Sequence, residues 1–382
     1  MNKMVNGKQC TVLWHVDDLM VSHVEQAVLD DLVTKLNDRF GSHLPVVAQR
    51  GDVHDYLGMT LDFSDTGKVK IIMDDFVQKL LSELPTDDYW QGIAPDPAAT
   101  SLFNVRNTSP KLNQRDADLF HSTTAKLLFL GMRARPDIMT AVSFLTTRVT
   151  SPDTDDRNKL RRVIQYLRGT RDLHLTLEPD DLHIYKWWID ASFAVHPNMR
   201  SHTGATASCG RGSFLSISSK QKINTRSSTT AELVGVDDCM GKILWTINFL
   251  QAQGYTTRHI IGQDNQSAIL LEKNGRLSSS KRTRHMNIRY FFITDCISKG
   301  QVEIEYVPTK EMLGDFFTKP LHGYLFKKLR AHILNLPLPE PPLSMVKPTQ
   351  SLHDSFVSQE CVGQADRRTT DSHKLNNSHS VE

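Results

Sequence analysis

The order of predicted elements in residues 183–335 constrains the fold of this 382-residue chain more than any other feature. Three short strand-like segments, separated by Gly- and Ser-rich turns, precede a stretch with helical apolar spacing at residues 230–253. The predicted order is β-β-β-α-β-α-α-β-α, with the later elements at residues 258–263, 266–273, 285–298, 302–307 and from about Gly314 onward. This alternation predicts a mixed α/β fold.

The rest of the chain divides into three further regions. Residues 1–110 contain short strands, helices at 27–40 and 74–84, and a linker at 85–110 that has four prolines. Residues 111–182 are mainly helical, with segments predicted at 116–132, 137–149 and 156–167 and a break at Pro136. Residues 336–382 are rich in Pro, Ser and His, which predicts a disordered tail.

The charge of the chain is unevenly distributed. The formal net charge is only +2, but residues 183–335 carry 20 Lys and Arg against 11 Asp and Glu. A local basic excess of this kind favours a polyanionic partner, although it says nothing about the fold.

Cysteine usage and hydropathy indicate the compartment. The five cysteines include no C-x-x-C pair, so neither a disulfide framework nor a cysteine zinc site is expected. Asp17 and Asp18 interrupt the first apolar stretch, and no window of about 18 apolar residues occurs. We therefore expect an intracellular protein, cytoplasmic or nuclear, that is neither secreted nor associated with a membrane.

Four acidic residues of the basic region lie beside apolar segments: Asp190, Glu232, Asp264 and Asp315. Each has an ordinary structural explanation. Residues 229–232 have the spacing of a capping box, Asp264 and Asp315 stand at predicted helix starts, and Asp190 can simply close a strand. Because all four recur at element ends in this β/α order, a shared site is the more attractive interpretation.

Converging carboxylates repel one another and resist desolvation unless a cation neutralises them. Hard oxygen ligands favour Mg²⁺ or Mn²⁺. Two such ions about 4 Å apart can activate a water molecule and stabilise the leaving oxygen in phosphodiester cleavage.

Five ordered strings in this region resemble the ribonuclease H domain of copia-type LTR retrotransposon Pol polyproteins. They are KWWIDASFAVH (186–196), SSTTAELVG (227–235), GQDNQSAI (262–269), RTRHMNIRYFFI (282–293) and YVPTKEMLGDFFTKPL (306–321). The resemblance implies a ribonuclease H-like mixed sheet flanked by helices. It also implies that Asp190, Glu232, Asp264 and Asp315 are the catalytic, metal-binding acids of a nuclease that uses two Mg²⁺ ions, with Mn²⁺ as a substitute.

The N-terminal half extends this resemblance to the reverse transcriptase of the same polyprotein. WHVDDLMVSH (14–23) resembles its metal-binding hairpin, with His15 in the place of an aromatic residue, so Asp17 and Asp18 are expected at a hairpin tip as the remnant of a polymerase metal site. A plain turn is the alternative. Residues 1–110 then correspond to the end of the reverse transcriptase, 111–182 to a helical connection and 183–335 to ribonuclease H. Since only 16 residues precede Asp17, we expect no polymerase activity from this chain.

A short basic stretch contains weaker candidates for nucleic-acid contact, namely Lys281, Arg282, Arg284 and His285. A solvated loop or a localisation signal explains the first three equally well, and His285 can contact a phosphate or simply begin a helix.

The resemblance and the acidic set together imply an endonuclease that cleaves the RNA strand of RNA–DNA hybrids. The expected partners are the hybrid and either the missing upstream polymerase portion or another Pol chain. The alternative is a non-catalytic Pol relic that binds hybrids without cleaving them.

Overall fold

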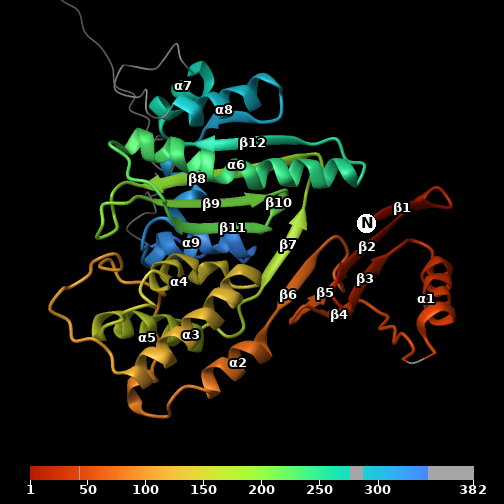
Figure 1. Ribbon diagram of the computed structural model, residues 1–382, viewed down its shortest axis with the longest axis horizontal. Coiled ribbons are helices and arrows are strands. Elements are labelled where there is room, and N and C mark those ends of the chain that lie inside the picture. The colour runs from red at the N-terminus through yellow and green to blue at the C-terminus, as the bar shows by residue number, and fades with distance from the viewer. Residues whose placement is uncertain (43, 276–286, 343–382) are drawn as a thin grey trace, which may run out of the picture. The chain divides into compact units, whose positions relative to one another are not determined.

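The computed structural model describes residues 1–42, 44–275 and 287–342, and residues 1–340 form one compact unit (Figure 1). Its described strands form three sheets, with the orders β1-β2-β3, β10-β7-β6-β5-β4 and β11-β9-β8-β12-β13. Lys281, Arg282, Arg284 and His285, and the tail beyond residue 342, lie outside the described residues.

The first sheet is an antiparallel meander followed by a helix. It consists of β1 (Asn2–Val5), β2 (Lys8–His15) and β3 (Asp18–Ser22), and α1 (Gln26–Phe40) follows it. His15 pairs with Asp18 across the β2–β3 turn, and Val16 takes a positive φ of 51° there. The expected hairpin is therefore present, with Asp17 in its turn and Asp18 at the start of β3.

The second sheet joins segments that are far apart in the sequence. It contains β4 (Val53–Tyr56), β5 (Met59–Asp62), β6 (Val69–Ile72), β7 (Leu175–Pro179) and the short β10 (Gly210–Arg211). All its neighbouring strands are antiparallel, and β7 pairs on one side with β6 and on the other with β10. Strand β7 was not predicted, although Leu173, Leu175 and Leu177 alternate with polar residues.

The third sheet is the mixed sheet that the sequence predicts. It contains β8 (Ile184–Ser192), β9 (His202–Ser208), β11 (Leu215–Lys220), β12 (Arg258–Gln263) and β13 (Glu303–Tyr306). The first three form an antiparallel meander, whereas β12 runs parallel to both β8 and β13. This is the ribonuclease H-like arrangement, in which the central strand β8 lies between β9 and β12.

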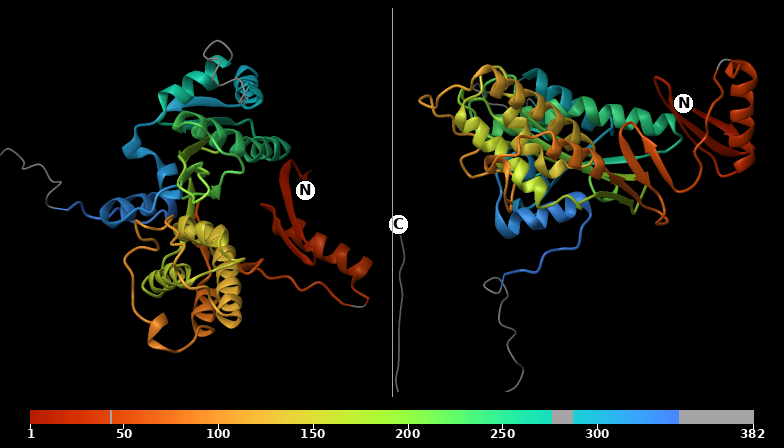
Figure 2. Two further views of the ribbon diagram at one scale, coloured as in Figure 1. Left: turned by 60° about the vertical axis from the view of Figure 1, so that its left-hand side comes forward. Right: turned by 90° about the horizontal axis from the view of Figure 1, so that it is seen from below.

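The long helix α6 (Ser228–Ala252) runs along one face of this sheet (Figures 1 and 2). Trp187 and Ile189 lie on the same face of β8 and are fully buried beneath α6. They pack in one core with three buried residues of α6, Val236, Met240 and Ile243. Helices α7 (Gln266–Asn274) and α8 (Asn287–Ser298) complete this part of the fold. Because α6 buries its apolar face on β8, the side of β8 that carries Asp190 is left for other elements.

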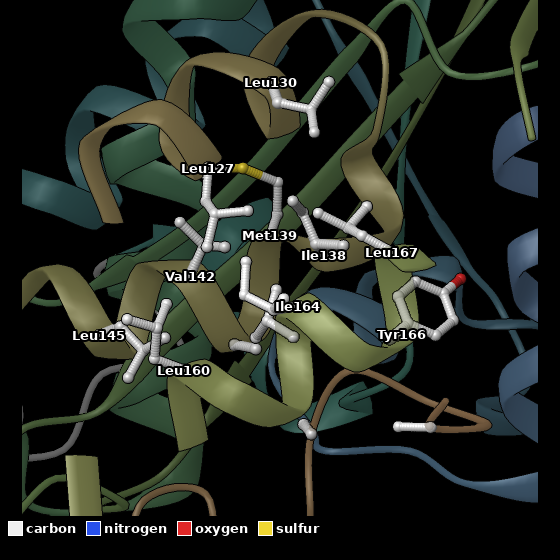
Figure 3. Close-up of a cluster of buried hydrophobic side chains, with 14 of the residues drawn as sticks. Leu127, Leu130, Ile138, Met139, Val142, Leu145, Leu160, Ile164, Tyr166 and Leu167 are labelled. Atoms are coloured by element: carbon white, nitrogen blue, oxygen red, sulfur yellow. The ribbon is translucent and has the colours of Figure 1, made fainter. Parts of the chain in front are cut away.

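A second hydrophobic core lies among the helices that precede the mixed sheet (Figure 3). It is built from α2 (Asp74–Ser82), α3 (Gln114–Arg133), α4 (Met139–Thr146) and α5 (Thr154–Arg168), which carry the fully buried Leu127, Val142, Leu145, Leu160 and Ile164. The C-terminal helix α9 (Gly323–Leu334) contributes Phe326, Leu329 and Ile333 to this same core. Helix α9 therefore shares this core with α2, α3, α4 and α5.

Two segments differ from their expected form. Residues 85–110 are irregular, apart from a 3₁₀ turn at Asp88–Trp90, but Trp90, Leu102 and Phe103 are buried in the second core, so this segment is packed rather than free. The expected last helix does not continue from Gly314. A 3₁₀ helix, η6 (Leu313–Phe317), ends before Pro320, and α9 starts at Gly323. Proline lacks the N–H that a continuous helix needs, which explains the break.

None of the helices in the described part of the chain is long and apolar enough to cross a membrane.

Candidate metal centre

The register of two parallel strands brings the first two acids together. On β8 and β12, Trp188 pairs with Gly262. Asp190 follows two residues later within β8, and Asp264 follows two residues later directly after β12, so the two acids lie side by side at the end of the sheet. Asp190 is 3% exposed, whereas Asp264 is partly exposed at the end of its strand.

Asp315 reaches these residues because η6 packs closely on β8. A Cβ atom added at Gly314 would lie 2.9 Å from the backbone nitrogen of Asp190, so only a glycine permits this approach. Carboxylate oxygens of Asp190, Asp264 and Asp315 then lie within 4.8 Å of one another. The structure thus groups three of the four predicted acids.

Glu232 lies next to this group but outside the set of three. Helix α6 begins at Ser228, and its capping box joins Ser227 to Thr230, so Glu232 does not form the capping box that its spacing suggested. Glu232 is 5% exposed, and the side-chain amide of Gln263 donates to its Oε2 at 3.4 Å. Burial, reinforced by the charges of Asp190 and Asp264, raises the pKa of Glu232 to about 10.

Asp264 is likewise not a helix cap. The N-cap of α7 is Asn265, whose side chain accepts from the amide of Ala268. Asp264 is instead held by two contacts: its backbone N–H donates to the side-chain oxygen of Gln263 at 2.9 Å, and Thr309 Oγ1 donates to its carboxylate at 2.9 Å. Gln263 therefore orients both Asp264 and Glu232.

Sequence reasoning missed two further members of the site, Thr318 and Lys319. Thr318 is fully buried, and its hydroxyl donates to Asp190 Oδ2. Lys319 Nζ lies 2.6 Å from Asp315 Oδ1 and 3.7 Å from Asp190 Oδ2. Two signals could have found them: both lie in the string 306–321, and Lys319 is spaced i,i+4 from Asp315.

The charges in the site are strongly coupled. Burial and the neighbouring Asp190 raise the pKa of Asp315 to about 7, against the influence of Lys319. Burial alone would lower the pKa of Lys319, but the carboxylates of Asp190 and Asp315 raise it. Among the residues that the structure describes here, Lys319 provides one positive charge beside four carboxyl groups. This charge does not neutralise the cluster.

These residues fit a hard divalent cation. The acids present closely spaced carboxylate oxygens, which Mg²⁺ and Mn²⁺ prefer as ligands. The raised pKa values show that the carboxyl groups resist being charged together without further positive charge. An open groove of about 490 Å³, lined by Asp190, Glu232, Asp264 and Lys319, connects the cluster to the surface.

The other predicted metal site is not assembled in this way. Asp17 and Asp18 are exposed at the β2–β3 turn, and among the residues that the structure describes they join no group of three potential metal ligands. Their assignment as a remnant of a polymerase site stays a prediction.

The chain is similar in sequence to retrotransposon polyproteins, although no family model matches it. It is 27% identical over 336 residues to the Retrovirus-related Pol polyprotein from transposon RE2 of Arabidopsis thaliana, which covers 84% of this chain and 21% of the relative. It is 24% identical over 315 residues to the corresponding polyprotein from transposon TNT 1-94 of Nicotiana tabacum, covering 81% and 23%. The chain thus spans about a fifth of the length of these relatives.

Solved structures that align with part of the chain include a foamy viral protease-reverse transcriptase in complex with an RNA/DNA hybrid. It aligns with a TM-score of 0.47 and 11% identity over 78% of this chain and 36% of its own. LC11-RNase H1 aligns with a TM-score of 0.27 and 11% identity over 35% of this chain and 91% of its own. The long sequence matches and the ordered motifs show that the chain is similar to retrotransposon Pol polyproteins.

Proposed function

We propose that this chain hydrolyses the RNA strand of RNA–DNA hybrids in a metal-dependent endonuclease reaction. The observation that carries the proposal is the convergence of Asp190, Asp264 and Asp315, with oxygens within 4.8 Å of one another, beside the buried Glu232. Structural explanations for single acids do not account for four carboxyl groups held together at one end of a sheet.

Asp190, Glu232, Asp264 and Asp315 are the residues that would hold the divalent ions. Bound ions supply charge neutralisation and a more acidic water molecule. Thr318 fixes the orientation of Asp190 by donating to its Oδ2, and Gln263 fixes Glu232 and Asp264. The chain therefore holds its ligands in place through side chains that are themselves buried.

The proposed substrate class rests on the resemblance to ribonuclease H domains and on the basic charge of the region around the acid cluster. Residues 183–335 are rich in Lys and Arg, which favours binding of a phosphate backbone. A protein distinguishes RNA from DNA at a given site through the 2′-hydroxyl. We expect products with a 5′-phosphate and a 3′-hydroxyl.

The experiment uses the full chain with four labelled duplexes: RNA–DNA, RNA–RNA, DNA–DNA and a DNA duplex that carries one ribonucleotide. We expect Mg²⁺-dependent cuts within the RNA of the hybrid only, and the variant Asp190→Asn should bind the hybrid without cutting it. Lys310→Met, which changes an exposed side chain outside the acid cluster, is the matched control and should cut normally. Tight binding by the wild type with no cleavage in Mg²⁺ or Mn²⁺ would instead support the non-catalytic alternative.

A further inference from the structure

The ammonium group of Lys319 lies beside carboxylate oxygens that would bind a metal ion. Its ammonium group pairs with Asp315 Oδ1 at 2.6 Å and approaches Asp190 Oδ2 at 3.7 Å. Both oxygens belong to residues of the metal-ligand group. A carboxylate oxygen that is hydrogen-bonded to an ammonium group has less electron density to offer a cation, and the two positive charges repel each other.

The backbone around Lys319 is fixed, but its side chain has a path to solvent. The amide N–H groups of Thr318 and Lys319 both donate to the carbonyl oxygen of Asp315, at 3.2 and 3.0 Å, and Pro320 follows. The Lys319 side chain is 40% exposed and lines the open groove, whereas Asp190 and Asp315 are 4% and 12% exposed. The ammonium group can therefore leave the cluster by side-chain rotation alone, while the acids stay in place.

We propose that Lys319 is a tethered counter-ion that competes with a divalent metal ion for Asp190 and Asp315. This inference rests on the metal site of the proposed function and deepens it, because it names the residue that sets the metal affinity. In the metal-free protein Lys319 neutralises part of the acid cluster. When the ion binds, the ammonium group moves out into the groove.

The test measures Mn²⁺ binding to the full-length protein by isothermal titration calorimetry, in the absence of nucleic acid. Lys319→Met removes the charge but keeps an unbranched side chain, and it should bind Mn²⁺ about three- to tenfold more tightly than the wild type. Lys319→Arg keeps the charge and should stay near the wild-type affinity. Lys310→Met, which removes a lysine that is exposed outside the cluster, controls for the loss of net charge and should leave the affinity unchanged.

The same titrations separate this inference from the proposed function. If Lys319→Met binds Mn²⁺ with unchanged or weaker affinity while the wild type still cuts hybrids, Lys319 does not compete with the metal and the inference is wrong, but the nuclease assignment stands. If Asp190→Asn binds Mn²⁺ as well as the wild type and hybrids stay uncut, the metal site itself is wrong. Circular dichroism of each variant verifies that it is folded.

Discussion

Glu232 should make the metal-free protein less stable as the pH rises. Its pKa is about 10 in the folded chain, compared with an ordinary value of 4.5, so the folded state holds this proton more tightly than the unfolded state. For a group whose folded pKa is raised, the stabilising contribution is complete below the unfolded pKa and is lost as the pH rises towards the folded pKa. The affected window therefore begins near pH 4.5 and includes neutral pH.

The size of the effect follows from the width of that window. Between pH 4.5 and pH 8 the folded state keeps Glu232 protonated, which lowers the free energy of unfolding by about 1.4 kcal/mol per pH unit. The upper bound over this range is about 5 kcal/mol. Relaxation and water entry reduce such penalties, so we expect about 1–3 kcal/mol. Glu232→Gln removes the ionisation, keeps the shape of the side chain and retains an oxygen that can accept from Gln263.

The assay is urea unfolding of the wild type and Glu232→Gln in EDTA at pH 5 and at pH 8. The unfolding free energy of the variant minus that of the wild type should be about 1–3 kcal/mol larger at pH 8 than at pH 5. Adding Mg²⁺ should stabilise the wild type more than the variant, because the ion replaces the proton. Glu311→Gln, an exposed control on the 3₁₀ turn η5 (Thr309–Glu311), should show no such change. A difference between the wild type and Glu232→Gln that does not depend on pH would refute the reasoning.

Three further predictions address how the site is supported. Gly314→Ala places a methyl group within 2.9 Å of the Asp190 backbone, so it should push Asp315 away and weaken Mn²⁺ binding in calorimetry. Ser218→Ala removes the hydroxyl that donates to the Phe317 carbonyl at 2.8 Å and should lower the unfolding free energy by about 1–3 kcal/mol in urea. A fragment of residues 183–335 exposes the apolar side chains of α9, so its melting transition should be lower or absent in circular dichroism, unlike that of the full chain. A Mn²⁺ affinity, unfolding free energy or melting transition equal to that of the wild-type full chain would show that the corresponding contact does not have the proposed role.

Strands and helices of the mixed sheet were predictable because their apolar periodicity is local. The alternating Trp187 and Ile189 define β8, and the predicted strand at 258–263 coincides with β12. The position of Asp190 beside Asp264 depends on the register of the parallel strands β8 and β12. The order of elements is consistent with parallel strands, but it does not fix their register. Their positions at element ends singled out the four acids, the resemblance implied a catalytic role for them, and the structure then showed which of them lie together.

Local sequence patterns did not predict the contacts between segments that are distant in the sequence. Strand β7 is short, and its pairing with β6 spans about 100 residues of sequence. The prolines of residues 85–110 suggested a linker because a pattern of turn residues does not reveal that Trp90 and Phe103 are buried. Thr318 and Lys319 were missed because their contacts with Asp190 and Asp315 depend on how η6 packs against β8, which no local pattern reveals.

The most direct test of the central claim is the initial rate of RNA cleavage in an RNA–DNA hybrid by the full chain, measured with Mg²⁺ and with EDTA. We expect cleavage only with Mg²⁺ and a loss of at least about a hundredfold for Asp190→Asn, since oriented metal ligands are required for this chemistry. Equal cleavage by the wild type and Asp190→Asn, or a folded wild type that binds the hybrid and leaves it intact, would contradict the assignment.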